Sequence, residues 1–350
     1  MVNAPAGSAF SVVIVSAISA VMAVTLHAQQ QLPRYTERVD VTRVIVDARA
    51  VDGRGQPLLG LEPEDFLVKI DGKPARVESA LWVAGGAVDT SGMPTASTEI
   101  SGYASPAPPG RLIVFLFQKD LEPSRIVGFM RLLIEAREFL ASFRPTDRVA
   151  VVSFDYHLKV WVDFTNDFAS IERILAHGIL FEKPGAVEPS AGVSLVQRLD
   201  PAKGRKTYSM EKALLAIADA LEPLPGTKSL VLVGHGFGRL SGSSLNVDRE
   251  YGSAVEAFQA GRVTVFTLDT TDADYHTLEA GLISVAEHTG GFFRRTHLFS
   301  RAAMDHLAGA LAGHYVLFVE KPFGEKGYHR IEVDLARRKG TVMARNGFVG

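Results

Sequence analysis

The residues best suited to binding chemistry follow a near-continuous apolar segment. Residues 112–117 ("LIVFLF") lead into Gln118, and Asp120, Glu122 and Ser124 come next at alternate positions. Strand ends at the carboxyl edge of a parallel sheet are where α/β proteins bind ligands. Because Mg²⁺ and Mn²⁺ prefer oxygen donors, Asp120, Glu122 and Ser124 form a candidate cation site. The simpler interpretation is a solvated loop that leads into a helix with Ser124 as its N-cap.

A second strand end carries the glycine-rich sequence "LVLVGHGFG" at residues 230–238. A strand followed by G-x-S-x-G is the nucleophile elbow of α/β-hydrolases. Here Gly236 occupies the serine position, so the hydroxyl that would react is missing. We interpret the glycines as residues that give the backbone freedom at a strand end. The segment also lacks the Lys-Ser/Thr pair of a phosphate-binding P-loop.

Other kinds of chemistry have weaker support. Asp269, Asp272 and Asp274 follow a later strand-like run, where a polar turn is a simpler interpretation than a ligand set. The histidines show no H-x-x-x-H or H-E-x-x-H spacing, so we expect core or surface positions. The absence of cysteine excludes disulfides, thiolate sites and cysteine nucleophiles. The net charge of −2 provides no electrostatic footprint for nucleic acid.

The elements that must position these residues alternate between strands and helices over residues 111–312. Apolar runs predict the strands, and apolar positions at helical spacing predict the helices. Two consecutive strands are close enough in sequence for an antiparallel hairpin. We therefore predict an α/β domain with a doubly wound, mostly parallel sheet and one antiparallel edge strand. The expected strands are 112–117, 148–154, 158–164, 229–234, 262–269 and 292–295, and the expected helices are 124–143, 167–177, 209–221, 247–260, 276–288 and 300–312.

Short strand-like segments flank this domain on both sides. Residues 39–84 show alternation and turn residues, and Asp71-Gly72 is a strong hairpin signal. Residues 313–350 contain further strands. Neither piece is large enough to bury a core alone, so we expect both to form one smaller β-rich module. Residues 85–110 are rich in Gly, Ser, Thr, Pro and Ala and predict a linker or long loop.

The first 28 residues are apolar and end in small residues. This pattern is typical of a signal peptide with a cleavage site after Ala28. The run is also about long enough to span a bilayer, so an uncleaved N-terminal membrane anchor is the alternative. In both cases we expect an exported protein, periplasmic or extracellular, that meets the membrane only through an uncleaved N-terminus.

Several segments together resemble the von Willebrand factor A (vWA) domain, and in detail the VWFA-related family known mainly from Acidobacteria. The N-terminal match is "VIVDARAVDGRGQPLLGLEPEDFLVKIDGKPARV" (44–77). Later matches are "RVTVFTLDT" (262–270), "AEHTGGFFRR" (286–295) and the C-terminal segment 314–349. The resemblance covers nearly all of residues 39–349 and implies a vWA-like fold. It also implies a metal-ion-dependent adhesion site (MIDAS) at the carboxyl edge, where a cation with an open position meets a partner's carboxylate.

The residues at the implied MIDAS positions depart from the family's ligand pattern. Gln118 and His235 stand where the resemblance implies aspartates, and Lys119 adds a positive charge beside the loop carboxylates. We therefore predict a degenerate MIDAS that lacks its metal. The positions at this ligand edge are Gln118, Asp120, Glu122, Ser124, Thr207 and His235.

These observations predict an exported, non-enzymatic binding module that recognises a protein partner through loops at the carboxyl edge. The loops are 118–124, 183–208, 235–247 and 269–276. We expect no cofactor, and Mg²⁺ or Mn²⁺ at Asp120, Glu122 and Ser124 is the weaker alternative. A structural envelope protein, in which the domain is only a spacer, is the second functional hypothesis. A hydrolase is the least supported.

Overall fold

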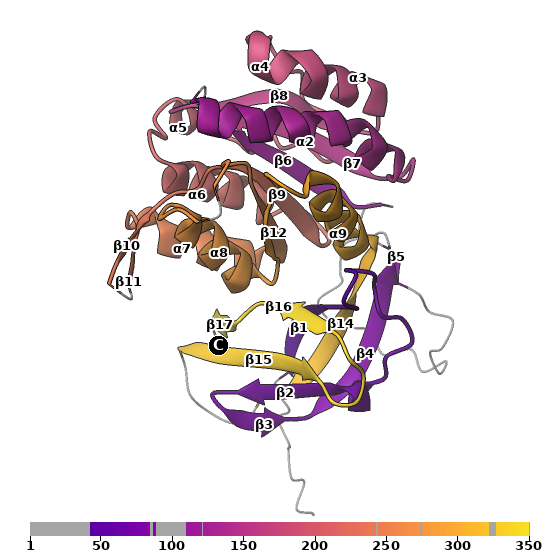
Figure 1. The fold of residues 1–350 in the computed structure, drawn as a ribbon. Helices are drawn as coiled ribbons and strands as arrows, with labels where there is room; N and C mark the ends of the chain where they lie inside the picture. Colours follow the sequence, from indigo (N-terminus) through magenta and orange to yellow (C-terminus); the bar gives the residue numbers. More distant parts are fainter. Residues whose placement is uncertain are drawn as a thin grey trace, which may run out of the picture. The chain divides into compact units, whose positions relative to one another are not determined.

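The central feature of the chain is a six-stranded sheet in the order β13-β12-β9-β6-β7-β8 (Figure 1). The structure, a computed structural model, describes residues 43–84, 87–88, 110–120, 122–242, 244–273, 275–321 and 327–349. All neighbouring strands are parallel except β7 and β8, so the predicted mostly parallel sheet with one antiparallel edge strand is confirmed. The strands are β6 (Leu112–Gln118), β7 (Arg148–Phe154), β8 (Leu158–Thr165), β9 (Lys228–Gly234), β12 (Val263–Asp269) and β13 (Phe293–Arg295).

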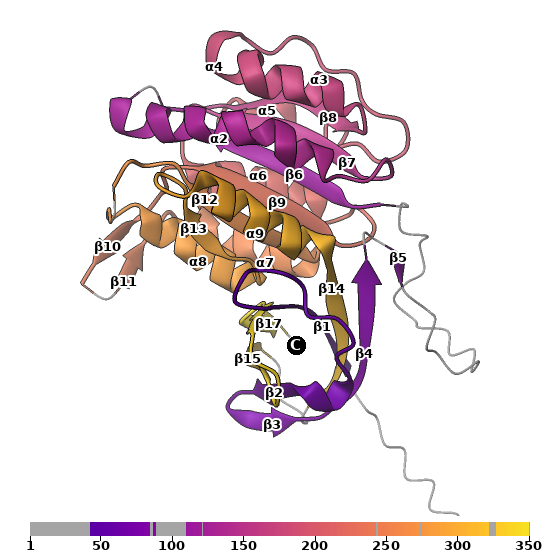
Figure 2. The same cartoon turned by 45° about the vertical axis from the view of Figure 1, so that its right-hand side comes forward.

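Helices cover both faces of this sheet because successive side chains of β6 point to opposite faces. Residues such as Val114 pack with α6, α7 and α8, whereas residues such as Phe115 pack with α2, α3 and α9. Figure 2 shows these helices around the sheet. A strand that is buried on both faces has a continuous apolar sequence, and β6 could therefore be predicted from the sequence. The helices are α2 (Pro123–Ala141), α3 (Phe168–Arg173), a π-turn (Ile174–Gly178), α4 (Ile179–Phe181), α5 (Pro201–Gly204), α6 (Met210–Leu221), α7 (Glu250–Ala260), α8 (Glu279–Thr289) and α9 (Ser300–Ala312).

N-terminal and C-terminal strands form the expected second β-rich module. β1 pairs with both β14 and β16, and β2 pairs with β15, so each sheet mixes the two ends of the chain. Tyr315 fills their shared core, with ring centroids 5.3 Å from Phe66 and 5.0 Å from Trp82. The strands are β1 (Arg43–Val51), β2 (Phe66–Ile70), β3 (Lys73–Ala75), β4 (Val77–Ala84), β5 (Ala87–Val88), β14 (Gly313–Glu320), β15 (Tyr328–Leu335), β16 (Thr341–Ala344) and β17 (Gly347–Val349).

The predicted hairpin at Asp71-Gly72 joins β2 to β3. Both residues have positive φ, 51° and 76°, as a two-residue type I′ turn requires. Within the expected linker, Ala87–Val88 pair with β4. The rest of that segment up to residue 109, the N-terminal 28 residues and Asp274 lie outside the described residues. In the part that is described, no helix is long and apolar enough to cross a membrane.

Polar contacts connect the β-rich module to the α/β sheet, and Thr42–Gly350 form one compact unit. The buried guanidinium of Arg49 in β1 donates from Nη1 to Thr264 Oγ1 (2.9 Å) and from Nε to the Ala310 carbonyl (3.2 Å). Asp47 in the same strand forms an ion pair with Arg262, which directly precedes β12. The module is therefore fixed at the amino end of β12, away from the strand ends that carry the candidate site.

Helix α2 packs closely against the loop that follows β12. A Cβ atom added at Gly128 would lie 2.0 Å from the Thr270 carbonyl oxygen, which no side chain tolerates without movement of the backbone. Gly252 in α7 has no atom within 4 Å of the same position and is exposed. The two helical glycines therefore form a matched pair for a test of this contact.

We predict that Gly128→Ala lowers the free energy of unfolding by about 1–3 kcal/mol, because overpacking forces α2 away from the loop. Gly252→Ala is expected to raise it by up to about 1 kcal/mol, because alanine is the better helix former. Urea denaturation followed by circular dichroism measures both. Equal effects of the two substitutions would contradict the close approach.

Candidate functional site

Gln118, the last residue of β6, joins the ends of two neighbouring parallel strands. Its Oε1 accepts hydrogen bonds from the backbone N–H groups of His235 (3.1 Å) and Gly236 (3.0 Å). Its Nε2 donates to the Gly236 carbonyl oxygen (2.9 Å). A carboxamide has both a donor and an acceptor, whereas an ionised carboxylate only accepts. An aspartate or glutamate therefore cannot reproduce this set of contacts.

The two glycines after β9 each prevent a collision, Gly234 with Gln118 and Gly236 with the loop before α8. A Cβ atom at Gly234 would lie 2.5 Å from Gln118 Oε1. Gly236 has a φ of 101°, and a Cβ atom there would lie 2.2 Å from the Leu278 carbonyl oxygen. Both positions thus need glycine for a steric reason, and neither supplies a nucleophile.

Asp120 lies beside the bridge and forms an ion pair with Arg125 from the first turn of α2. Its Oδ1 accepts a hydrogen bond from the Glu122 N–H (3.0 Å), and its Oδ2 lies 3.9 Å from Nε2 of His235. Burial raises the pKa of the Asp120 carboxyl, but the bonds from Glu122 and Arg125 outweigh it and the pKa is lowered. The Glu122 and Ser124 side chains are exposed. Asp120 is therefore an ionised carboxylate that already has a cationic partner.

Ser124 does not cap α2, so the N-cap prediction is wrong. The cap position is Glu122, because Pro123 begins the helix with a fixed φ and without an N–H group. The Ser124 carbonyl instead accepts a hydrogen bond from the Asp272 N–H (2.6 Å), which joins α2 to the loop after β12. Its hydroxyl is thus not needed to start the helix.

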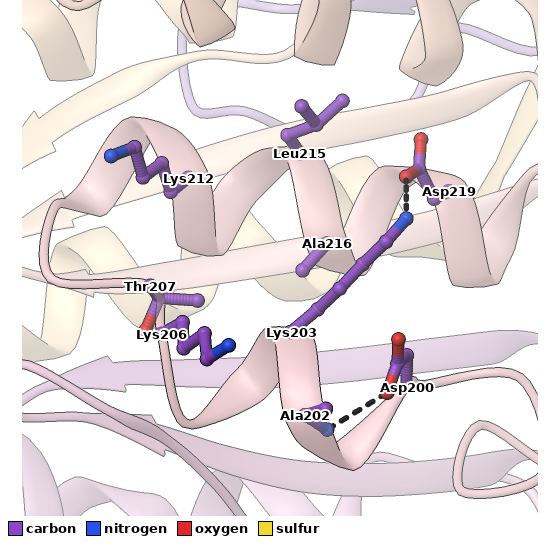
Figure 3. A pocket seen from close by; sticks show the side chains of 9 residues that line it. All are labelled: Asp200, Ala202, Lys203, Lys206, Thr207, Lys212, Leu215, Ala216 and Asp219. Atoms are coloured by element: carbon purple, nitrogen blue, oxygen red, sulfur yellow. Dashed lines mark hydrogen bonds and ion pairs between the residues drawn. The ribbon is translucent and has the colours of Figure 1, made fainter.

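Thr207 does not join the group around Gln118. Its hydroxyl is buried and donates to the carbonyl oxygens of Gly204 (3.1 Å) and Tyr156 (3.4 Å). It lines a separate groove of about 390 Å³ between α5 and α6 (Figure 3). Lys203 spans that groove to Asp219, with Nζ 3.4 Å from Oδ2. Such exposed ion pairs contribute little, and we assign no site to this groove.

A second groove of about 500 Å³ contains three of the six predicted ligand-edge residues. Gln118, Asp120 and His235 line it from the ends of β6 and β9, whereas Glu122 and Ser124 do not. Its other walls are the β7–β8 turn, α4 and the start of α6, where Ser209 rather than Thr207 contributes. The groove therefore lies at the carboxyl edge of the sheet.

Two tyrosines at this groove have unusual backbone conformations. Tyr156 has a φ of 72° and Tyr208 a φ of 52°, values that are outliers for bulky residues. The Tyr208 N–H donates to the Tyr156 carbonyl (3.0 Å), so the two loops hold each other in place. The residues are 72% and 61% exposed despite this constraint. Backbone strain of this kind is often retained where it presents a side chain to a ligand.

The charged groups in the groove are largely paired. Lys119 lies over the Trp161 ring, with Nζ 5.8 Å from the centroid, and burial lowers its pKa. Asp155 Oδ2 pairs with Lys159 Nζ (2.7 Å). The other oxygen of Asp155 is buried and accepts no hydrogen bond from the described residues. The groove thus presents exposed aromatic rings and has no large excess of either charge.

The residues at the implied MIDAS positions do not fit Mg²⁺. This ion takes a near-octahedral set of oxygen ligands. Gln118 has both amide heavy atoms in bonds to the β9 loop, and His235 supplies nitrogen instead of oxygen. The Arg125 guanidinium already supplies a positive charge to Asp120 through Oδ2. The predicted absence of a metal at this edge remains a prediction, and the donor chemistry favours it.

Sequence reasoning did not identify Arg125, Tyr156 or Tyr208. A basic residue in the first turn of the helix after an acidic loop was a usable signal for the Arg125 pair. The left-handed conformations of the tyrosines depend on tertiary contacts and have no local signal. The sequence also did not reveal a buried Asp269–His276–Glu279 cluster, because the three residues meet only when the loop between β12 and α8 folds back.

The structure of this chain is similar to solved vWA structures, at low sequence identity. No family model matches the sequence, and no curated protein is significantly similar to it. BatB from Bacteroides thetaiotaomicron covers 57% of this chain and 98% of its own, with 13% identity and a TM-score of 0.36. A von Willebrand factor type A protein from Catenulispora acidiphila covers 83% and 74%, with 11% identity and a TM-score of 0.40. The vWF domain of the pilus tip protein Mfa5 from Porphyromonas gingivalis covers 56% and 93%, with 12% identity and a TM-score of 0.37. Function must therefore be argued from this chain's own residues.

His235 generates a prediction about pH. Burial, with a contribution from Arg125, lowers the pKa of its imidazole to about 4. An unfolded histidine binds its proton near pH 6.5. Between these values the unfolded state binds more protons, so the stability present above about pH 6.5 is lost as the pH falls towards 4. From about pH 7 to pH 5 this group should reduce the free energy of unfolding by about 1–2 kcal/mol.

Urea midpoints at the two pH values test this prediction. His235→Gln is expected to lose less stability on acidification than the wild type, and His177→Gln, which removes an exposed imidazole, should behave like the wild type. His314, whose pKa burial also lowers to about 4, should leave a residual loss in both variants. An unchanged pH dependence in His235→Gln would show that His235 is not held neutral.

Proposed function

We propose that this chain is an exported, non-enzymatic binding module that holds a segment of a partner protein in the groove at the carboxyl edge of its sheet. The observation that carries the proposal is the pair of left-handed tyrosines, Tyr156 and Tyr208, whose exposed rings lie at that groove. Tyrosine provides a large contact area at low entropic cost and is enriched in protein interfaces. The apolar N-terminal segment supports export.

The proposed contact does not use a metal at Asp120. The Arg125 guanidinium takes the place of the cation, and Gln118 holds the strand ends together. Because most charged groups in the groove are paired, we expect a partner segment with little net charge.

Catalysis has less support than binding. A hydrolase needs a nucleophile, a base and oxyanion donors within reach of one another. The strand-end position that carries serine in α/β-hydrolases is Gly236, and His235 lies beside an ion-paired carboxylate rather than a free hydroxyl. The groove thus supports recognition better than chemistry.

The experiment is a quantitative crosslinking capture from cell envelopes of the source organism. We predict that Tyr156→Ala and Tyr208→Ala each reduce recovery of the partner by at least about tenfold, as expected for interface hot spots. Tyr328→Ala removes a tyrosine of similar exposure, 59%, from the β-rich module and should capture the partner normally. Circular dichroism spectra establish that each variant is folded.

Two outcomes would oppose the proposal. Equal recovery by wild type and both groove variants would mean that the partner binds elsewhere. Capture of no partner that depends on these loops would favour the structural envelope hypothesis.

A further inference from the structure

A buried cluster of metal-type ligands lies where the loop after β12 returns to α8. Asp269 ends β12, His276 lies in the loop, and Glu279 begins α8. One ligand atom from each residue lies within 4.8 Å of the other two, and Asp269 Oδ2 is 2.7 Å from His276 Nε2. The Asp269 side chain is fully buried, and that of Glu279 is 3% exposed.

Two buried carboxylates in one place need positive charge. Arg295 supplies one charge to Glu279 through two hydrogen bonds of 2.9 and 2.7 Å. Asp269 has no lysine or arginine partner among the described residues. It accepts bonds from the Thr271 N–H (2.9 Å) and from His276. Asp269 is therefore a buried carboxylate whose side-chain partner in the described part of the chain is the imidazole of His276.

A second observation comes from Thr271 in the same loop. Its hydroxyl is buried and makes no hydrogen bond to the described part of the chain. Buried polar atoms in native proteins are nearly always paired, and this hydroxyl is one of seven exceptions in the described part of the chain. An ion with its bound water at the cluster would offer it a partner. The Thr271 backbone is already fixed by its bond to Asp269.

The first ligand is held rigidly. The Asp269 carbonyl accepts hydrogen bonds from both the N–H and the hydroxyl of Thr296, each at 2.8 Å. The neighbouring Thr270 N–H donates to the Gly234 carbonyl (2.8 Å). A preorganised carboxylate of this kind lowers the entropic cost of binding an ion.

We infer that Asp269, His276 and Glu279 bind a transition-metal dication of the Zn²⁺ class. An imidazole with two carboxylates suits Zn²⁺ and its neighbours better than Mg²⁺, which prefers oxygen ligands alone. Three protein ligands leave a fourth tetrahedral position for water. Glu279 can keep Arg295, because each carboxylate oxygen has a second lone pair.

The geometry needs shifts of up to about 1.4 Å, because the ligand atoms lie within 4.8 Å of one another and tetrahedral ligands lie about 3.4 Å apart. Zn–N and Zn–O bonds near 2.1 Å place two tetrahedral ligands about 3.4 Å apart. The bonded pair of Asp269 and His276 is 2.7 Å apart and must separate by less than about 1 Å. His276 lies in a loop and is 18% exposed, so its ring has room to move. The site would then stabilise the loop whose Leu278 carbonyl accepts a hydrogen bond from the Phe237 N–H at the groove (3.1 Å).

The test is equilibrium dialysis of untagged full-length protein against Zn²⁺, with metal measured in the protein fraction. We expect the wild type to bind one Zn²⁺ per chain. His276→Gln keeps a donor for Asp269 but removes the imidazole, and we expect affinity to fall by at least about tenfold. His177→Gln, which removes an exposed imidazole, should bind like the wild type. A rise in the melting temperature with Zn²⁺ that is lost in His276→Gln is the second readout.

Two outcomes of the dialysis would contradict a Zn²⁺ site at this cluster. Absence of stoichiometric Zn²⁺ binding, or binding that His276→Gln leaves unchanged, would overturn the inference. If His276→Gln does not fold, Asp269→Asn replaces it, and the same loss of binding is expected. The inference is independent of the proposed partner groove, because neither Tyr156 nor Tyr208 contributes to the cluster.

Discussion

The carboxyl edge of this sheet depends on one side chain, the carboxamide of Gln118. It accepts two backbone hydrogen bonds from the β9 loop and returns one to Gly236, so it fixes how two parallel strands end. Gly234 leaves space for this side chain, because a Cβ atom there would collide with Gln118. Gly236 is required for a different reason, since its Cβ atom would collide with the Leu278 carbonyl. Where a metal site would join these strand ends through a shared cation, this chain joins them through hydrogen bonds.

The charged and titratable groups beside Gln118 are balanced by other side chains. Asp120 pairs with Arg125, and His235 is kept neutral by burial. The exposed aromatic rings of Tyr156 and Tyr208 are then the surface that we propose for a partner. The strain in Tyr156 and Tyr208 is consistent with a site shaped for contact. The β-rich module is fixed at the opposite end of β12 through Arg49 and Asp47 and leaves this edge open.

Most of the fold could be predicted because burial on both sheet faces produces long apolar runs, as in β6 and β9, and because Asp71-Gly72 specifies its own turn. The proximity of Gln118 and His235 also followed, since parallel neighbours end at one edge. The role of Gln118 could not be predicted, because it depends on the path of the β9 loop. Thr207 was misplaced because its hydroxyl satisfies local carbonyl groups. The Asp269–His276–Glu279 cluster was missed because its ligands converge through a loop instead of a helical or strand spacing.

The most direct test of this account is calorimetric titration of the purified protein with Mg²⁺, in the wild type and in Asp120→Ala. If Gln118 and Arg125 replace the cation, no heat that depends on Asp120 will appear up to millimolar Mg²⁺, and the two proteins will give the same trace. A sub-millimolar isotherm in the wild type that disappears in Asp120→Ala would contradict the account, because it would mean that the edge binds its metal after all.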